Sequence, residues 1–285
     1  MLFFGTTFSF ASAALLGFFY KLPIFPLATL LAKLSAMSGA AIVLQIFSAL
    51  GTFVLPAILF AKLFEYEPIS FLKLKKLPSI NTVLATFILF FLANFVLNIL
   101  VKATYLVPFE SFDISFINQL LETEKQTENA LKAFLEFTSP IYLVFVFIMM
   151  AVLPALGEEL TFRGVFFNLF KRSSQSVWIG IVLSAFIFAL IHFQLHNFLA
   201  IFFMGALLAY VYYLSGNLWV SIAAHLFNNG MIVILTYASK IGYLDYDFTN
   251  TDDIPLIFSI FGSVIFLAFF YFYRLWVLKE KNNSI

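Results

Sequence analysis

The sequence has no cysteine and few charged residues. Without cysteine the chain can form no disulfide, no thiolate metal site and no cysteine nucleophile. Charged residues make up 11% of the chain, whereas soluble domains carry about a quarter. The formal net charge of +1 offers no basic surface of the kind that binds nucleic acid. The composition therefore excludes an ordinary soluble domain and indicates no nucleic-acid partner.

Several catalytic signatures are missing as well. The Gly-x-Ser-x-Gly turn of serine hydrolases is absent, and no serine is marked as a nucleophile. Only three histidines occur; His192 and His196 are four residues apart, but no glutamate follows His192 to complete a His-Glu-x-x-His zinc motif. Carboxylates and imidazoles remain, and these groups can activate water by general acid and base catalysis.

Long apolar runs dominate what is present. Hydrophobic residues make up 62% of the chain, and the mean hydropathy is +1.00. The runs are continuous, unlike the alternating segments of about ten residues in a membrane β-barrel. They predict an all-α, polytopic transmembrane helical bundle of about eight spans, at residues 1–20, 41–60, 80–101, 140–172, 177–193, 198–214, 218–238 and 254–273.

Three segments of this prediction need comment. Residues 1–20 are a first span or a signal peptide, and the lack of a preceding basic region favours a span. Residues 22–40, which contain two prolines and a lysine, are interpreted as a connecting or interfacial segment. Residues 140–172 are too long for one straight crossing at 1.5 Å per residue, so we expect an interruption at Pro154.

The charges of the loops predict an orientation. Residues 62–76 are rich in lysine, which places them in the cytoplasm by the positive-inside rule. Residues 102–136 are acidic and are expected outside, with an amphipathic surface helix that acts as a plain interfacial helix or as a docking lid. The charged loops that follow agree with the same alternation of cytoplasmic and outer sides. We therefore expect an integral protein of a bacterial inner (plasma) membrane, with cytoplasmic N- and C-termini.

Charged residues interrupt one apolar run. Charges inside a span are costly and usually mark a working site. Glu159 and Arg163 are four residues apart on one helix face, a favourable arrangement for an ion pair. Glu158 points about 100° away and has no partner on its own helix. The alternative is that the ion pair only holds two helices together while Glu158 caps a helix after Gly157.

Two later spans add polar groups at compatible depth. His192 is predicted in the fifth span, and His225 in the seventh, where Asn229 shares its helix face. Glu158, His192 and His225 would all lie roughly 10 to 25 Å from the cytoplasmic ends of their helices. His196, near the outer surface, is expected to be a satisfied structural group.

Taken in order, these motifs resemble those of the CAAX protease and bacteriocin-processing family of intramembrane proteases, which includes the Ras-converting enzyme. They are Glu158-Glu159-x-x-x-Arg163, Phe188-x-x-x-His192 and His225-x-x-x-Asn229. The resemblance covers about residues 140–240. It implies three domains: N-terminal transmembrane helices with an acidic outer loop (1–139), a catalytic helical core (140–240), and an outer loop with the last transmembrane helix and a basic tail (241–285).

The resemblance also implies roles for individual residues. Glu158 and His192 would activate the catalytic water, and His225 and Asn229 would support the tetrahedral oxyanion by donating hydrogen bonds. Glu159 and Arg163 would give structural support.

The implied function is that of an intramembrane endopeptidase. It would contact membrane lipid and hydrolyse a peptide or protein substrate, prenylated or membrane-anchored, and it would bind no nucleic acid. The family is often described as metalloproteases, although a metal-free glutamate mechanism is also argued. Histidine, glutamate and asparagine side chains could hold zinc through nitrogen and oxygen.

Two other functions stay open. One is a non-catalytic membrane interaction or bacteriocin-immunity protein of the same family. The other is a transporter in which Glu158 relays protons, although the sequence lacks clear duplicated halves.

Overall fold

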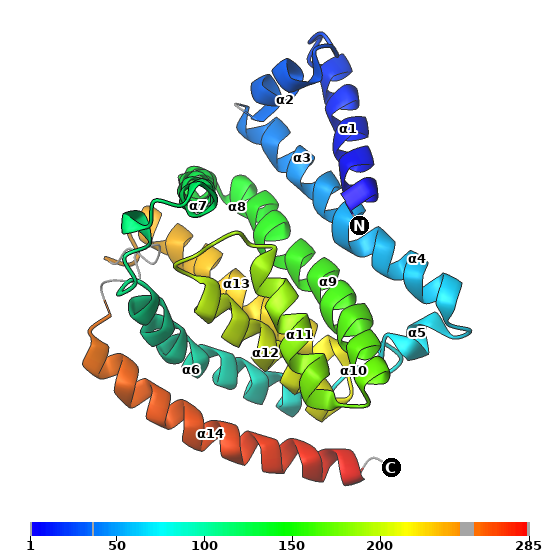
Figure 1. Ribbon diagram of the computed structural model, residues 1–285, viewed down its shortest axis with the longest axis vertical. Coiled ribbons are helices and arrows are strands. Elements are labelled where there is room, and N and C mark those ends of the chain that lie inside the picture. The colour runs from blue at the N-terminus through cyan, green and yellow to red at the C-terminus, as the bar shows by residue number, and fades with distance from the viewer. Residues whose placement is uncertain (1, 36, 246–253, 284–285) are drawn as a thin grey trace.

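The computed structural model describes residues 2–35, 37–245 and 254–283, and within these ranges the chain is helical and contains no β-strand (Figure 1). Six helical segments there are long and apolar enough to cross a bilayer: Gly39–Phe64, Ile80–Ser111, Pro140–Ser174, Phe198–Ser215, Leu218–Lys240 and Leu256–Glu280. Two shorter apolar helices, Thr6–Phe19 and Val177–Leu190, match the first and fifth predicted spans. The prediction of an all-α polytopic bundle is therefore confirmed.

The N-terminal helices form an arm at one end of the molecule in Figure 1. They are α1 (Leu2–Phe19), α2 (Leu27–Ser35), α3 (Ser38–Ala49), the π-helix η1 (Leu50–Val54), α4 (Leu55–Phe64) and the short α5 (Pro68–Phe71). The segment 22–40 is not a plain connector, because it contains all of α2 and the start of α3. Its prolines precede α2, and the Pro26 carbonyl accepts the Thr29 amide at 3.1 Å, so proline begins this helix rather than breaking it.

The bundle core is built around α6 (Ile80–Thr104). The last helix, α14 (Leu256–Asn283), lies along it, and α12 (Phe198–Ser215) and α13 (Leu218–Lys240) pack against its other side (Figure 1). Between α6 and the fourth span come the 3-10 turn η2 (Phe109–Ser111) and the amphipathic helix α7 (Ser115–Leu135), as the acidic segment predicted. Most of the second acidic loop, including Asp247, Asp252 and Asp253, lies outside the described residues.

The fourth predicted span is one continuous helical rod. Its segments are α8 (Pro140–Phe147), η3 (Ile148–Val152), α9 (Leu153–Glu159), η4 (Leu160–Phe167) and α10 (Asn168–Ser174), of which η3 and η4 are π-helical. The expected interruption at Pro154 is therefore wrong. Proline cannot donate to the Met150 carbonyl four residues back. The helix continues here through π-turns, in which the Leu153 amide bonds the Ile148 carbonyl five residues back.

The fifth span is shorter than predicted. Helix α11 ends at Leu190, and residues 191–197 form a turn that leads into α12. His192 therefore lies in this turn and not within a transmembrane helix. Phe193 has a positive φ of 52°, which an L residue rarely adopts and which ends the helix there without a glycine or proline.

Contacts between loops define two ends of the bundle. At one end the Trp219 indole donates to the Leu74 carbonyl at 3.1 Å, and Arg172 pairs with Glu65. At the other end Lys240 pairs with Glu136. Loops that the charge pattern predicts on the same side of a membrane thus come together in space.

Close helix packing at Gly205 shapes the interior. A Cβ atom added to this residue of α12 would lie 3.3 Å from the Ala185 Cα atom of α11. Small residues let helix backbones approach in this way inside membranes, where van der Waals packing drives association. The approach also exposes the Gly205 carbonyl to a side chain from η4, described next.

Candidate active site

Glu159 lies at the centre of a buried polar cluster. Its side chain is fully buried, and it comes from the end of α9. Oε1 accepts hydrogen bonds from Arg163 at 2.7 Å and from His225 Nδ1 at 2.8 Å, and Oε2 accepts one from Ser221 Oγ at 2.5 Å. Three donors therefore satisfy this carboxylate, one from the fourth span and two from α13.

Arg163 completes the ion pair that the four-residue spacing predicted. Its side chain is 1% exposed. One terminal nitrogen bonds Glu159, the other donates to the Gly205 carbonyl at 2.8 Å, and the guanidinium lies 4.7 Å from the centre of the Phe188 ring. The arginine thus ties η4 to α11 and α12. A buried carboxylate tolerates this environment only with such a partner.

His225 lies between the two glutamates. Its Nδ1 bonds Glu159, and its Nε2 lies 3.9 Å from Glu158 Oε2. Since Glu159 is the partner of Arg163 and acts as an acceptor, the shared proton belongs to His225 Nδ1. In a neutral imidazole Nε2 then has no hydrogen. With this tautomer Nε2 could donate to an oxyanion only in the imidazolium form, and the role of His225 as an oxyanion donor stays a prediction.

Glu158 is a carboxylate whose hydrogen-bonding capacity is not filled by the described residues. Its side chain is 13% exposed, and its Oε2 atom is buried and accepts no hydrogen bond from any described residue. The 3.9 Å to His225 Nε2 is too long for a direct hydrogen bond and fits one water bonded to both groups. A buried polar atom left unpaired by protein is unusual and points to a functional role.

Asn229 is hydrogen-bonded to a backbone carbonyl of the fourth span, one turn before Pro154. Its Nδ2 donates at 3.2 Å to the Met150 carbonyl. Pro154, four residues later, has no N–H to donate to that carbonyl. Its Oδ1 accepts from Asn228 Nδ2 at 3.3 Å, and Asn228 Oδ1 in turn accepts from Asn94 of α6 at 3.4 Å. These contacts fix which way the Asn229 amide points and leave one of its two N–H bonds for another acceptor.

His192 approaches the cluster from the turn after α11. Its Nδ1 is 2.6 Å from the Phe188 carbonyl, and its ring lies 4.7 Å from the Phe188 ring. A carbonyl can only accept, so the proton is on Nδ1 and Nε2 is the basic nitrogen. Phe188 also contacts His225, at 6.2 Å between ring centres. In the described residues no hydrogen bond joins His192 to Glu158, His225 or Asn229; the rings of His192 and His225 meet only through the Phe188 ring between them.

Sequence reasoning missed several members of this site. Ser221 lies four residues before His225, so the helical spacing could have identified it. Asn94 and the Met150 carbonyl come from other helices, and no local pattern indicates them. Their roles depend on how the helices are aligned in space.

A zinc ion needs three or four protein ligands. Among the described residues no group of three histidine, aspartate or glutamate side chains is placed to hold a metal. Glu159 and His225 Nδ1 are already bonded to each other, which leaves Glu158 and the Nε2 atoms of His225 and His192, and these three groups are not placed together to hold a metal. The candidate residues therefore do not fit such a site, and no catalytic step is assigned to a metal here.

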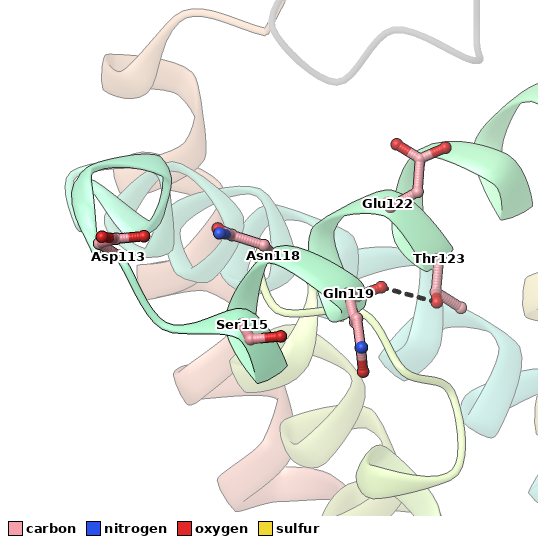
Figure 2. Close-up of a pocket in the computed structure, with 6 residues that line it drawn as sticks. All are labelled: Asp113, Ser115, Asn118, Gln119, Glu122 and Thr123. Atoms are coloured by element: carbon pink, nitrogen blue, oxygen red, sulfur yellow. Dashed lines mark hydrogen bonds between the residues drawn. The ribbon is translucent and has the colours of Figure 1, made fainter.

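One surface hollow lies on the first turns of α7, away from these residues. Figure 2 shows its polar lining. The lining residues are Asp113, Ser115, Asn118, Gln119, Glu122 and Thr123, none of which belongs to the candidate site. We assign it no role in catalysis.

The fold and the buried carboxylate–histidine cluster define a helical membrane protein with a buried polar site between its helices. Comparison with known proteins agrees. Residues 140–231, which include every candidate site residue, match the family described as type II CAAX prenyl endopeptidase Rce1-like. This match confirms the resemblance seen in the three motifs, and residues 140–231 are similar to that family.

One curated relative is "Putative membrane peptidase YdiL" of Bacillus subtilis (strain 168). It is 27% identical over 126 residues, which make up 44% of this chain and 50% of that protein. The match thus spans about half of the relative's length. No solved structure matches the chain.

Proposed function

We propose that this protein is an intramembrane endopeptidase that hydrolyses a peptide bond with water activated by Glu158 and His192. One observation carries the proposal: the hydrogen-bonded carboxylate of Glu159 orients His225 toward Glu158, whose buried Oε2 accepts no hydrogen bond from the described residues. This arrangement is typical of a site that handles a proton rather than one that only joins helices. The family match and the membrane-peptidase relative support the same class of reaction.

The reaction follows from the positions of the acceptors. A water lies near Glu158 and the basic Nε2 of His192. It gives a proton to Glu158 as its oxygen attacks the substrate carbonyl. The carbonyl oxygen becomes an oxyanion, which the free N–H of Asn229 and a protonated His225 stabilise. One such donor is worth about 2.7 to 4 kcal/mol in related sites. The abstracted proton then passes to the leaving nitrogen as the C–N bond breaks, and the remaining hydroxyl proton follows, so a carboxylate and an ammonium group are released.

The substrate is proposed to be a peptide or protein delivered from the membrane. The described helices expose many large apolar side chains, as expected for contact with lipid. A prenylated or otherwise anchored substrate would reach the site laterally. Its backbone must meet polar partners there, because unsatisfied amide groups are costly in lipid.

Reconstitution into liposomes tests the proposal. The purified chain would be mixed with membrane-anchored peptides, and the fragments identified by mass spectrometry. We expect cleavage by the wild type and none by the double variant Glu158→Ala/His192→Ala. Equal cleavage by both would contradict the role of these residues. If the protein cleaves nothing while its cellular phenotype survives alanine at Glu158, His192, His225 and Asn229, the non-catalytic interaction protein is favoured.

The orientation is proposed from charge: residues 62–76 and both termini in the cytoplasm, and α7 outside, in a bacterial inner membrane. Because the chain lacks cysteine, single cysteines report their side without background. We expect Lys75→Cys to react with a membrane-impermeant maleimide only after cells are opened, and Gln126→Cys to react in intact cells. Both positions are exposed. The reverse pattern would overturn the orientation.

A further inference from the structure

A buried carboxylate outside the candidate site binds the turn that carries His192. Glu124 of α7 is 4% exposed, although α7 is an otherwise largely exposed amphipathic helix. Its oxygens accept the backbone N–H of Leu195 at 3.1 Å and of His196 at 3.2 Å, and His196 Nδ1 at 3.0 Å. The Asn197 side chain contacts it at 3.5 Å. One carboxylate thus holds three consecutive residues that lie about seventy positions away in the sequence.

The second half of this contact is His196. Its ring stacks on Tyr105 from the end of α6, with 4.3 Å between ring centres and 14° between planes, and it meets the edge of Phe109 at 5.5 Å. Its Nε2 lies 3.5 Å from Glu110, whose side chain is exposed. We call Glu124 and His196 together the clasp. The clasp joins α7 and the end of α6 to the turn between α11 and α12.

The turn needs an external support. Residues 191–197 lie outside regular helix, and the positive φ of Phe193 is costly for a residue with a side chain. Such conformations persist where surrounding contacts over-determine them. The turn's own backbone bonds run from the His192 and Phe193 amides to Ala189 and Leu190 at its start, and from the Phe198 and Ile201 amides to Leu195 and Asn197 at its end. None of these bonds uses the Leu195 and His196 amides, which bond the clasp.

We propose that Glu124 and His196 are positioning residues that hold His192 in its reactive place through this turn. The inference rests on the proposed function, since it concerns the residue assigned to activate water. It gives the outer amphipathic helix a specific task. Of the two interpretations of that helix, a plain interfacial segment would need no buried carboxylate. A buried charge that accepts several hydrogen bonds fixes geometry, because removing it leaves the donors unsatisfied.

The test compares Glu124→Ala with Glu122→Ala. Glu122 is an exposed neighbour on the same helix that accepts a hydrogen bond from Gln126 and, among the described residues, none from the turn, so it is the matched control. We expect Glu124→Ala to lower kcat by about 100-fold, the cost of a small misplacement of a reacting group. KM should stay within about twofold, because His192 acts on water and not in binding. Glu122→Ala should behave as the wild type.

A second readout does not need activity. Only three histidines occur in the chain, so carbethoxylation of each is resolved by mass spectrometry. We expect Glu124→Ala to increase the modification rates of His192 and His196 by about tenfold, because a released turn opens locally. His225 should not change. Unchanged kcat together with unchanged modification rates would overturn the inference.

Two further arms keep the outcomes separate. Glu124→Gln retains an acceptor oxygen for the backbone amides, so it should recover part of kcat and part of the protection of His192. If it recovers neither while its thermal midpoint equals that of the wild type, the inference is wrong. If instead His192→Ala keeps full activity, the proposed function fails, and the modification rates alone decide whether the clasp orders the turn.

Discussion

Replacing Glu158 with glutamine is expected to lower kcat for peptide hydrolysis by about 100- to 10,000-fold, the usual contribution of a general base. Glutamine has nearly the same shape but cannot take a proton from water. Because Glu158 Oε2 accepts no hydrogen bond from described residues, the folded protein loses no contact there. The thermal midpoint in detergent should therefore stay at the wild-type value while activity disappears.

The measurement is the initial rate of fragment release in liposomes, with the unfolding midpoint recorded on the same sample. Glu67→Gln is a suitable control, because Glu67 is an exposed glutamate whose ion pair with Lys75 lies at the surface. It should alter neither quantity. A Glu158→Gln protein with more than about a tenth of the wild-type kcat would contradict general-base catalysis by this residue.

Much of the architecture is predictable from the sequence because the bilayer imposes it. Unbroken apolar runs of suitable length must be helical in lipid, where every backbone group needs an internal partner. The runs therefore located the spans, and the four-residue spacing of Glu159 and Arg163 gave the ion pair now seen at 2.7 Å. Local periodicity is sufficient for such contacts, since both partners lie on one helix.

Contacts between helices were harder to predict. The sequence gives no rotation or vertical shift of one helix relative to another, so the placement of His225 between both glutamates could not be derived. Glu124 and the turn at His196 are separated by about seventy residues, and no pattern in either segment indicates that they are in contact. The end of α11 was also missed, because Ile191 and Phe193 continue the apolar run past the last helical residue.

The assignment of Pro154 as a break failed for a related reason. Proline removes one donor, and its cost depends on whether the freed carbonyl finds another partner. Here the Asn229 amide supplies it from a different helix. The same contact that keeps the helix continuous also fixes a proposed oxyanion donor, so the apparent helix breaker contributes to the candidate site.

Removing one partner of the buried ion pair is expected to have the largest effect on stability. Arg163→Met should lower the free energy of unfolding by about 3–5 kcal/mol, because it leaves the carboxylate of Glu159 charged, buried and short of its main partner. It also removes the donor to the Gly205 carbonyl. Equilibrium unfolding by SDS titration in mixed micelles measures this loss, and Glu67→Gln, at the exposed pair, should give no measurable change.

The double variant Glu159→Gln/Arg163→Met tests the cause. If the loss in Arg163→Met comes from an unpaired buried charge, neutralising Glu159 as well should restore a large part of the stability. Glutamine can still accept from His225 through its oxygen, and its amide nitrogen can donate to the Ser221 hydroxyl, so the fourth span and α13 stay joined. A double variant less stable than Arg163→Met would mean instead that the pair stabilises the fold in its own right. Activity should stay low in either case, because His225 no longer has a charged partner at position 159.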